Sequence, residues 1–266
     1  MNQSIQQEVV IQEYESVFRE SSLLDLSFEN AERYNQIFKH TLLRACIDVS
    51  KLGVGVRVLE VGAFTGVVST TLARLGYQVS ASDVPFVITD PALGQFLKSE
   101  GVECCAVDLT ADATFPHPDG FFDVIVFHSV LTHLNVNPIP ILREFHRLLG
   151  EKGVIYCNTP NLLCAKNIWQ MVSGKGYLDP VRHLVQNLES GKGISVGLHW
   201  REWTKAELID LFDFCGFDVE HHRFEVTTPN RSKFPRKQLV SLLYFIRPSL
   251  MTTQIGVFRK KAFGLK

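Results

Sequence analysis

Residues 56–66, VRVLEVGAFTG, decide the fold of this 266-residue chain. The stretch begins with a short apolar run, passes through a loop with two glycines, and continues into a helical pattern that reaches residue 75. A strand, a glycine loop and a helix in that order place a ligand at the carboxyl end of the first strand of an open parallel sheet. Gly62 and Gly66 allow the backbone to approach this ligand closely, because glycine has no Cβ.

Apolar strands and amphipathic helices alternate along the chain after this loop. Strands are predicted at 78–82, 102–107, 121–127 and 154–158, and an amphipathic helix at 139–149 is predicted to stop at Gly150. The segment 121–127 is apolar except for Asp123, as expected for a central strand covered on both faces. The alternation predicts an α/β fold, with a Rossmann-like, mostly parallel sheet and helices on both faces.

The length of the chain fits one large domain or two small ones, and a single domain spanning 1–266 is predicted. Residues 1–50 show helical periodicity and are predicted to form an N-terminal cap, while 51–160 form the core that carries the glycine loop. Residues 161–200 break the strand–helix rhythm, which predicts an insertion over the carboxyl edge of the sheet, on the substrate side. Residues 201–266 are predicted to add the C-terminal strands and a helix.

The composition of the chain limits its cellular location and the metals or membranes it could bind. The six cysteines form no Cys-x-x-Cys pair and no zinc-finger spacing with histidine, so no metal site is predicted. No apolar run reaches the roughly 18–20 residues of a spanning helix, and the N-terminus lacks the pattern of a signal peptide. These features predict a cytoplasmic protein without stable membrane insertion, and they leave the oligomeric state open.

The charge and spacing of the glycine loop separate two classes of ligand. Nicotinamide and flavin dinucleotides bind a Gly-x-Gly-x-x-Gly loop that holds their pyrophosphate. This loop reads Gly-x-x-x-Gly, and Glu60 lies two positions before its first glycine, where a carboxylate would repel a pyrophosphate. S-adenosylmethionine has no phosphate and carries an ammonium and a sulfonium group, which a carboxylate attracts. The loop therefore favours S-adenosylmethionine, held by Glu60, Gly62, Ala63 and Gly66.

Two further acids are predicted at the carboxyl ends of neighbouring strands. Asp83 closes the second strand, where an acid usually accepts hydrogen bonds from ribose hydroxyls. Asp108 closes the third strand and is predicted to face the adenine amino group. Val84 and Leu109, which follow the two acids, are predicted to line the same site.

Taken as a set, these segments resemble the class I S-adenosylmethionine-dependent methyltransferases. The resemblance covers about residues 56–217 and rests on 58–62 (VLEVG), Asp83, 107–109 (VDL), 122–125 (FDVI), 128–134 (HSVLTHL), 142–149 (LREFHRLL) and 152–153 (KG). It implies a seven-stranded sheet whose last strand is antiparallel. Ala63 and Phe64 depart from the small, cysteine or glycine residues that are commoner in the loop of this family.

Two further segments, 158–161 (NTPN) and 199–204 (HWREWT), resemble those of a bacterial subset of this family. The subset is associated with methylation of glycans, lipopolysaccharides or natural products, which implies a biosynthetic role and a small-molecule, sugar or natural-product acceptor, methylated at oxygen. No nucleic-acid acceptor is expected, because no Asn/Asp-Pro-Pro-aromatic motif for a flipped base follows the fourth strand.

Three alternatives use the same scaffold: a non-catalytic cofactor-binding protein, an aminopropyl transferase and a dehydrogenase. The aminopropyl transferase needs several acids for a polyamine, and the insertion has only Asp179 and Glu189. The dehydrogenase is disfavoured by the loop spacing. A non-catalytic protein would keep the loop but lack an open substrate cleft.

Three histidines are candidates for the chemistry. Methyl transfer to a hydroxyl gains about 10²–10⁴-fold from a general base, and histidine suits this role near neutral pH. His128, directly after the fourth strand, is predicted to contact the cofactor or the substrate. His133 is predicted as the base, and His199 as a catalytic group that faces the substrate after the insertion. The alternative is that these side chains only pack at the rim.

Three further polar residues are predicted to bind the substrate. Asn158 and Asn161 end the fifth strand, and Arg201 follows the insertion. Asparagine also caps turns well, so a structural role for the two asparagines stays open. For Arg201 the alternative is a hinge held by Trp200 and Trp203 in the core.

The C-terminal part of the chain has an uneven charge. A helix at 204–214 is predicted to begin with a capping box, and a strand follows at 217–226. Residues 226–266 contain no Asp or Glu but nine Lys and Arg residues. Within this stretch the helix at 235–246 is apolar around most of its circumference, which predicts burial under the sheet. The alternative is contact of the basic, apolar segment with an anionic membrane surface or an anionic acceptor.

Overall fold

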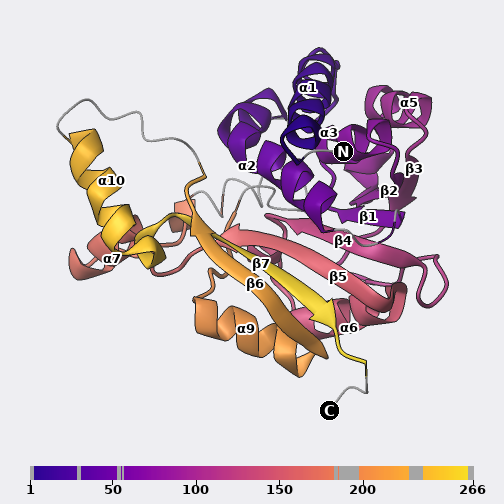
Figure 1. The fold of residues 1–266 in the computed structure, drawn as a ribbon. Helices are drawn as coiled ribbons and strands as arrows, with labels where there is room; N and C mark the ends of the chain where they lie inside the picture. Colours follow the sequence, from indigo (N-terminus) through magenta and orange to yellow (C-terminus); the bar gives the residue numbers. More distant parts are fainter. Residues whose placement is uncertain are drawn as a thin grey trace.

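Seven strands form one sheet in the order β3-β2-β1-β4-β5-β7-β6 (Figure 1). The computed structural model describes residues 3–28, 31–52, 55, 57–182, 185, 198–227 and 236–262. The first five strands in this order, from β3 to β5 across the sheet, are parallel, and β7 is antiparallel to both β5 and β6. The strands are β1 (Arg57–Val61), β2 (Gln78–Asp83), β3 (Glu103–Ala106), β4 (Phe122–His128), β5 (Leu149–Pro160), β6 (Phe217–Glu225) and β7 (Thr253–Lys260). The predicted fold class, including the antiparallel last strand, is confirmed.

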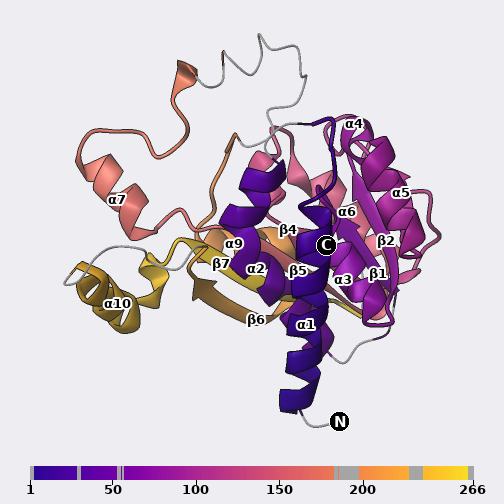
Figure 2. The ribbon, with the colours of Figure 1, turned by 90° about the horizontal axis from the view of Figure 1, so that it is seen from above.

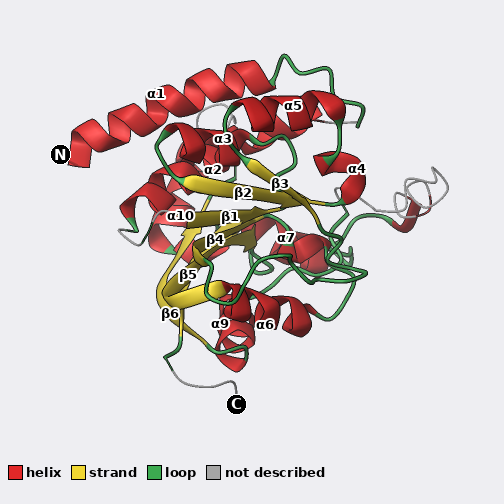
Figure 3. Ribbon diagram, turned by 90° about the vertical axis from the view of Figure 1, so that its right-hand side faces the viewer, coloured by secondary structure: helices red, strands yellow, loops and turns green. Residues whose placement is uncertain are grey.

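Helices cover both faces of this sheet (Figure 3). They are α1 (Gln3–Ser21), α2 (Ala31–Lys51), α3 (Val67–Arg74), α4 (Pro85–Ile88), α5 (Pro91–Ser99), α6 (Pro138–Leu148), α7 (Ala165–Val172), α9 (Lys205–Phe214) and α10 (Arg236–Ile246), with short 3-10 turns η1 (Leu131–His133) and η2 (Pro248–Leu250). Along β4, Val124 and Val126 belong to the core under α1, α2, α3 and α5. Ile125 and Phe127 belong to the core on the other face, under α6 and α9. This alternation follows from the two-residue period of a strand.

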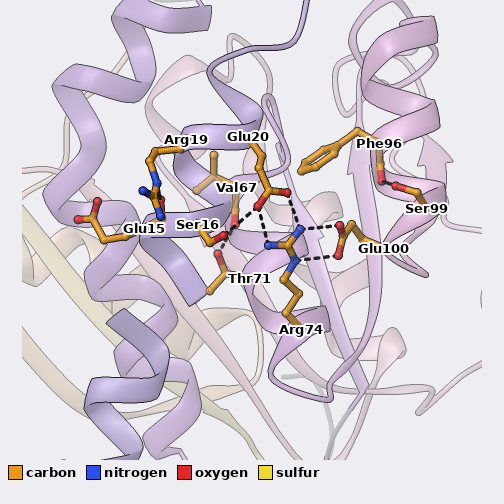
Figure 4. Close-up of polar contacts among 10 residues, drawn as sticks. All are labelled: Glu15, Ser16, Arg19, Glu20, Val67, Thr71, Arg74, Phe96, Ser99 and Glu100. Carbon is orange, nitrogen blue, oxygen red and sulfur yellow. Dashed lines mark hydrogen bonds and ion pairs between the residues drawn. The ribbon is translucent and has the colours of Figure 1, made fainter. Parts of the chain in front are cut away.

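The N-terminal helices hold the glycine loop in place. Arg74, in the last turn of α3, binds two carboxylates at once: Glu20 of α1 through nitrogen–oxygen distances of 3.0 and 2.6 Å, and Glu100 after α5 through 2.9 and 2.7 Å (Figure 4). At the loop, Thr65 Oγ1 donates to Asn35 of α2 over 2.7 Å, and Ser21 of α1 donates to the carbonyl of Thr65 over 2.9 Å. The helices predicted in the first 50 residues therefore brace the start of α3.

The prediction that Gly150 stops a helix is wrong. The helix α6 ends at Leu148, and Leu149 already pairs with Phe122, so Gly150 lies inside β5. Leu149 is fully buried and has an extended backbone, so the chain passes from helix to strand without a loop. The capping box predicted at 204–207 is confirmed at the beginning of α9.

The predicted burial of the C-terminal helix is also wrong. The helix α10 is present, but Leu242, Phe245 and Ile246 are 53%, 83% and 71% exposed. The reason is that α1–α3, α6 and α9 already cover the sheet, so α10 projects beyond it (Figure 1). None of the helices within the described residues combines the length and apolarity of a membrane span.

Candidate active site

The glycine loop turns sharply between β1 and α3. Gly62 and Gly66 have φ angles of 80° and 70°, in the left-handed region that favours glycine. The amides of Gly62 and Ala63 both donate to the carbonyl of Ser82 in β2, over 2.8 and 3.0 Å. A Cβ on Gly62 would lie 2.3 Å from Cγ2 of Val130, which follows β4. The loop is therefore pressed against the carboxyl ends of two neighbouring strands.

Glu60 lies beneath this loop, with 2% of its surface exposed. Its carboxylate accepts hydrogen bonds from the Ser69 amide over 2.8 Å and from the Ser69 hydroxyl. Burial raises the pKa of Glu60 to about 8, against the lowering effect of the Ser69 hydrogen bonds. The carboxylate thus fixes the first turn of α3, and its contact with the cofactor ammonium stays a prediction.

The acid that closes β2 lies directly beside the loop. Asp83 accepts from the Phe64 amide over 2.8 Å and from the Val84 amide over 2.7 Å. Burial raises the pKa of Asp83 to about 6. Each carboxylate oxygen keeps a further lone pair that can accept a hydrogen bond from a ribose hydroxyl. Asp108 lies in a tight turn, where one of its oxygens accepts from the amide and the hydroxyl of Thr110 over 2.9 and 2.7 Å, and its contact with the adenine stays a prediction.

Aromatic side chains from the N-terminal part cover the loop, which the sequence did not reveal. The ring of Tyr34 in α2 meets that of Phe64 edge-on, with centroids 4.7 Å apart, and Phe28 packs against Phe64 at 5.0 Å. Burial raises the pKa of Tyr34, and the charges of Glu60 and Asp83 raise it further. Tyr34 is therefore close to both acids. It lies one helical turn before Phe38, whose ring it also meets, with centroids 4.5 Å apart.

Two buried polar side chains at the carboxyl ends of β4 and β5 lack partners. His128 is 3% exposed, and neither of its ring nitrogens has a hydrogen-bond partner among the described residues; the same holds for Nδ2 of Asn158. Burial lowers the pKa of His128 to about 4, so the ring is neutral near pH 7 and offers one donor and one acceptor. The next residue, Ser129, has a left-handed backbone with φ 58°. Buried polar groups of this kind point to a bound ligand.

Two of the three candidate histidines lie together. The rings of His133 in η1 and His199 have centroids 5.2 Å apart. Nδ1 of His133 donates to the carbonyl of Leu198 over 2.7 Å, because a carbonyl can only accept. Thr132 joins the two segments: its hydroxyl donates to the carbonyl of Arg201, and its own carbonyl accepts from the amide of Trp200, both over 2.9 Å.

A carboxylate that sequence reasoning did not single out orients His199. Glu202 accepts from Nδ1 of His199 over 2.9 Å and, through its other oxygen, from Nδ2 of Asn167 in α7 over 2.5 Å. Its side chain is 8% exposed. The His-x-x-Glu spacing at 199–202 was the available signal. With Nδ1 protonated toward Glu202, Nε2 of neutral His199 carries the free lone pair.

The remaining candidates for substrate binding have structural partners. Asn161 donates to the carbonyls of Ser249 and Met251, both over 2.8 Å, which ties the end of β5 to η2. Arg201 stacks on Trp203 at 4.0 Å and pairs with Glu207 over 2.8 Å. Substrate binding by Asn161 and Arg201 stays a prediction. Within the insertion, residues 183, 184 and 186–197 lie outside the described residues.

This arrangement fits S-adenosylmethionine. The left-handed glycines open the loop to a ligand, Asp83 lies beside the loop, and His128 and Asn158 have buried polar atoms without partners among the described residues. The contact of Asp83 with the ribose stays a prediction. Among the described residues no group of three His, Cys, Asp or Glu side chains could hold a metal ion. The fold and the site define a class I S-adenosylmethionine-dependent methyltransferase.

Comparison with known proteins gives the same class. The family described as Methyltransferase domain matches residues 27–222, and the chain belongs to this family. A ubiquinone biosynthesis O-methyltransferase of Xanthomonas euvesicatoria pv. vesicatoria is 33% identical over 195 residues, which is 73% of this chain and 77% of that protein. The dehydrogenase, aminopropyl transferase and non-catalytic alternatives are thereby set aside.

Solved structures share the fold at lower identity. The 1,6-didemethyltoxoflavin-N1-methyltransferase of Burkholderia thailandensis, with bound S-adenosylhomocysteine, has a TM-score of 0.56 and 17% identity over 94% of this chain and 90% of that one. The [4+2]-cyclase SpnF has a TM-score of 0.55 and 19% identity over 83% of this chain and 82% of that one. The chemistry of this chain must therefore be argued from its site.

The position of Asp83 predicts a measurable loss of affinity. Replacement of Asp83 by alanine is expected to weaken binding of S-adenosylhomocysteine by about 1.5–3 kcal/mol, the scale for hydrogen bonds to a charged group. Titration calorimetry measures this, and Asp112→Ala is the control, because Asp112 lies in an exposed turn where it binds Thr114. Equal affinity in wild type and Asp83→Ala would remove the ribose assignment.

Proposed function

We propose that this protein transfers a methyl group from S-adenosylmethionine to a hydroxyl oxygen of a small-molecule, sugar or natural-product acceptor, with His199 as the general base. The observation that carries the proposal is the hydrogen bond between His199 and the buried carboxylate of Glu202. Oxygen as the acceptor atom is supported by the relatives, whose names describe O-methyltransferases. When bound, the cofactor supplies a methyl group that its sulfonium has already activated for displacement.

The division of roles between the two histidines follows from their surroundings. Burial lowers the pKa of His133 to about 4, against the raising effect of its hydrogen bond to the carbonyl of Leu198. A base with so low a pKa holds a proton poorly near neutral pH. His199 instead has a carboxylate on Nδ1, which stabilises the imidazolium formed when Nε2 takes the hydroxyl proton. His133, whose Nδ1 is bound to Leu198, then positions the acceptor through its own Nε2.

A labelled-methyl assay tests the reaction itself. The protein is incubated with S-adenosylmethionine that carries an isotopic methyl group and with a panel of phenols and sugars. We expect the label on oxygen of at least one acceptor, with one S-adenosylhomocysteine formed for each methyl group transferred. Label on nitrogen or carbon, or cofactor binding without turnover across the panel, would contradict the proposal.

Glu202 is a positioning residue, and its loss predicts a distinct signature. Glu202→Gln is expected to lower kcat by about 10–100-fold, because a neutral amide no longer stabilises the imidazolium of His199. The acid limb of the pH–rate profile should shift to lower pH, since the removed carboxylate favours the protonated ring. The cofactor Kd should not change.

The matched control is Glu220→Gln, which alters a carboxylate of β6 that pairs with Arg259 of β7. It should leave both kcat and the profile as in wild type. A Glu202→Gln enzyme with reduced kcat but an unshifted pH profile would indicate that Glu202 only supports the packing of α7.

A further inference from the structure

Two helices project from one side of the molecule. Figures 1 and 2 show α7 and α10 extending beyond the sheet on the side toward which the arrow of β5 points. The chain before α7 and the chain after α10 meet at the end of β5, where Asn161 donates to the carbonyls of Ser249 and Met251. The projecting part thus lies on the carboxyl-edge side, where the cofactor and acceptor sites are placed.

Large apolar side chains on both helices face outward. On α7, Trp169 and Val172 are 65% and 83% exposed, and on α10, Phe245 and Ile246 are 83% and 71% exposed. We give the name α7/α10 surface to the described apolar side chains of the two helices that are more than 40% exposed, which are Trp169, Met171, Val172, Leu242, Phe245 and Ile246. Single exposed apolar residues are normal, but several on neighbouring projections mark an interaction surface.

The sequence of the segment that carries α10 is basic. The helix α10 begins with Arg236 and Lys237 and is followed by Arg247, and no acid occurs between 226 and 266. The exposed Lys166 lies on α7. Arg247 has no ion-pair partner among the described residues. Arg259, near the far end of β7, is paired with Glu220.

We propose that the α7/α10 surface docks on an anionic lipid bilayer, so that the carboxyl edge of the sheet faces the membrane and the acceptor is an amphiphile held there. The second part rests on the proposed function. Exposed aromatic and aliphatic side chains enter the headgroup region, while neighbouring Lys and Arg residues bind anionic headgroups. A bilayer is favoured over a rigid protein groove because α10 exposes apolar residues on several sides, which fluid lipid can surround.

Vesicle co-sedimentation tests the docking. The full chain is mixed with phosphatidylcholine vesicles that either contain or lack phosphatidylglycerol, at low and high salt. We expect binding to the anionic vesicles at low salt and a loss of binding at high salt. Trp169→Ser combined with Phe245→Ser should reduce the partition coefficient at least about tenfold, because two large apolar side chains no longer enter the lipid. Lys166→Glu with Arg247→Glu should reduce it similarly.

Leu23→Ser is the matched control. Leu23 is 85% exposed, and its loop is attached elsewhere, since Ser27 binds Asp90 at the beginning of α5. Its replacement should leave vesicle binding unchanged. Calorimetric binding of S-adenosylhomocysteine to every variant shows that the cofactor site is intact.

Three outcomes would overturn the docking: no binding to anionic vesicles, equal binding of wild type and the Trp169→Ser/Phe245→Ser variant, or a dimer in sedimentation velocity that this variant dissociates without any vesicle binding. The last result would mean that a second copy covers the surface. The acceptor class is tested separately with an alkyl-chain phenol in vesicles against a short, water-soluble phenol. Equal kcat/KM for both, with vesicle binding retained, would remove the amphiphilic acceptor but not the docking.

Discussion

Replacement of His199 by alanine is expected to lower kcat by about 10²–10⁴-fold, the usual contribution of a general base. The imidazole is oriented through Nδ1 by Glu202 at 2.9 Å, and the carboxylate is itself held by Asn167. Alanine removes the proton acceptor without touching the glycine loop, so the Kd for S-adenosylhomocysteine should stay near the wild-type value. Steady-state kinetics and calorimetry measure the two quantities separately.

The matched control for His199 is His221→Ala, an exposed histidine on β6. It should have wild-type kcat. The comparison with His133→Ala decides the division of roles, because a positioning residue raises KM for the acceptor, whereas loss of the base lowers kcat. A His199→Ala enzyme with nearly full kcat, together with a His133→Ala enzyme that loses its acid limb, would reverse the assignment.

Much of the sheet could be predicted because its strands carry local signals. The run at 58–61, the glycine loop after it and the apolar segment around β4 each fit one element without reference to the rest of the chain. Gly150 was misassigned because glycine after an amphipathic helix normally ends it, and only the pairing of Leu149 with Phe122 shows that the strand has begun. Strand pairing is a long-range property that local sequence does not carry.

The site was predictable where a side chain follows a strand end. Asp83 and His128 could be placed this way, since the carboxyl ends of parallel strands share one edge. Tyr34 and Glu202 could not, because their roles depend on contacts across long stretches of chain: Tyr34 meets Phe64, and Glu202 joins His199 to Asn167 of α7. The same limit explains the wrong prediction for α10. Its apolar composition predicts burial, and the local sequence does not show that other helices already cover both faces of the sheet.

Replacement of Gly62 by alanine is expected to have the largest effect on stability. Two penalties act together. A Cβ at φ 80° costs roughly 1–2 kcal/mol, and its approach to within 2.3 Å of Val130 Cγ2 adds about 1–3 kcal/mol of overpacking. The sum lowers the free energy of unfolding by about 2–5 kcal/mol. It also displaces the loop, so binding of S-adenosylhomocysteine should weaken at least about tenfold.

A second glycine separates these two penalties. Gly76 has φ 90°, but a Cβ there would meet nothing within 4 Å. Gly76→Ala therefore carries only the backbone penalty and should leave cofactor binding unchanged. Urea unfolding should show a larger loss for Gly62→Ala, and adding Val130→Ala to it should restore part of the difference, a coupling on the order of 0.5–3 kcal/mol. Equal losses for the two glycine variants would mean that the loop yields to the new methyl group, and that close packing against Val130 does not shape the cofactor site.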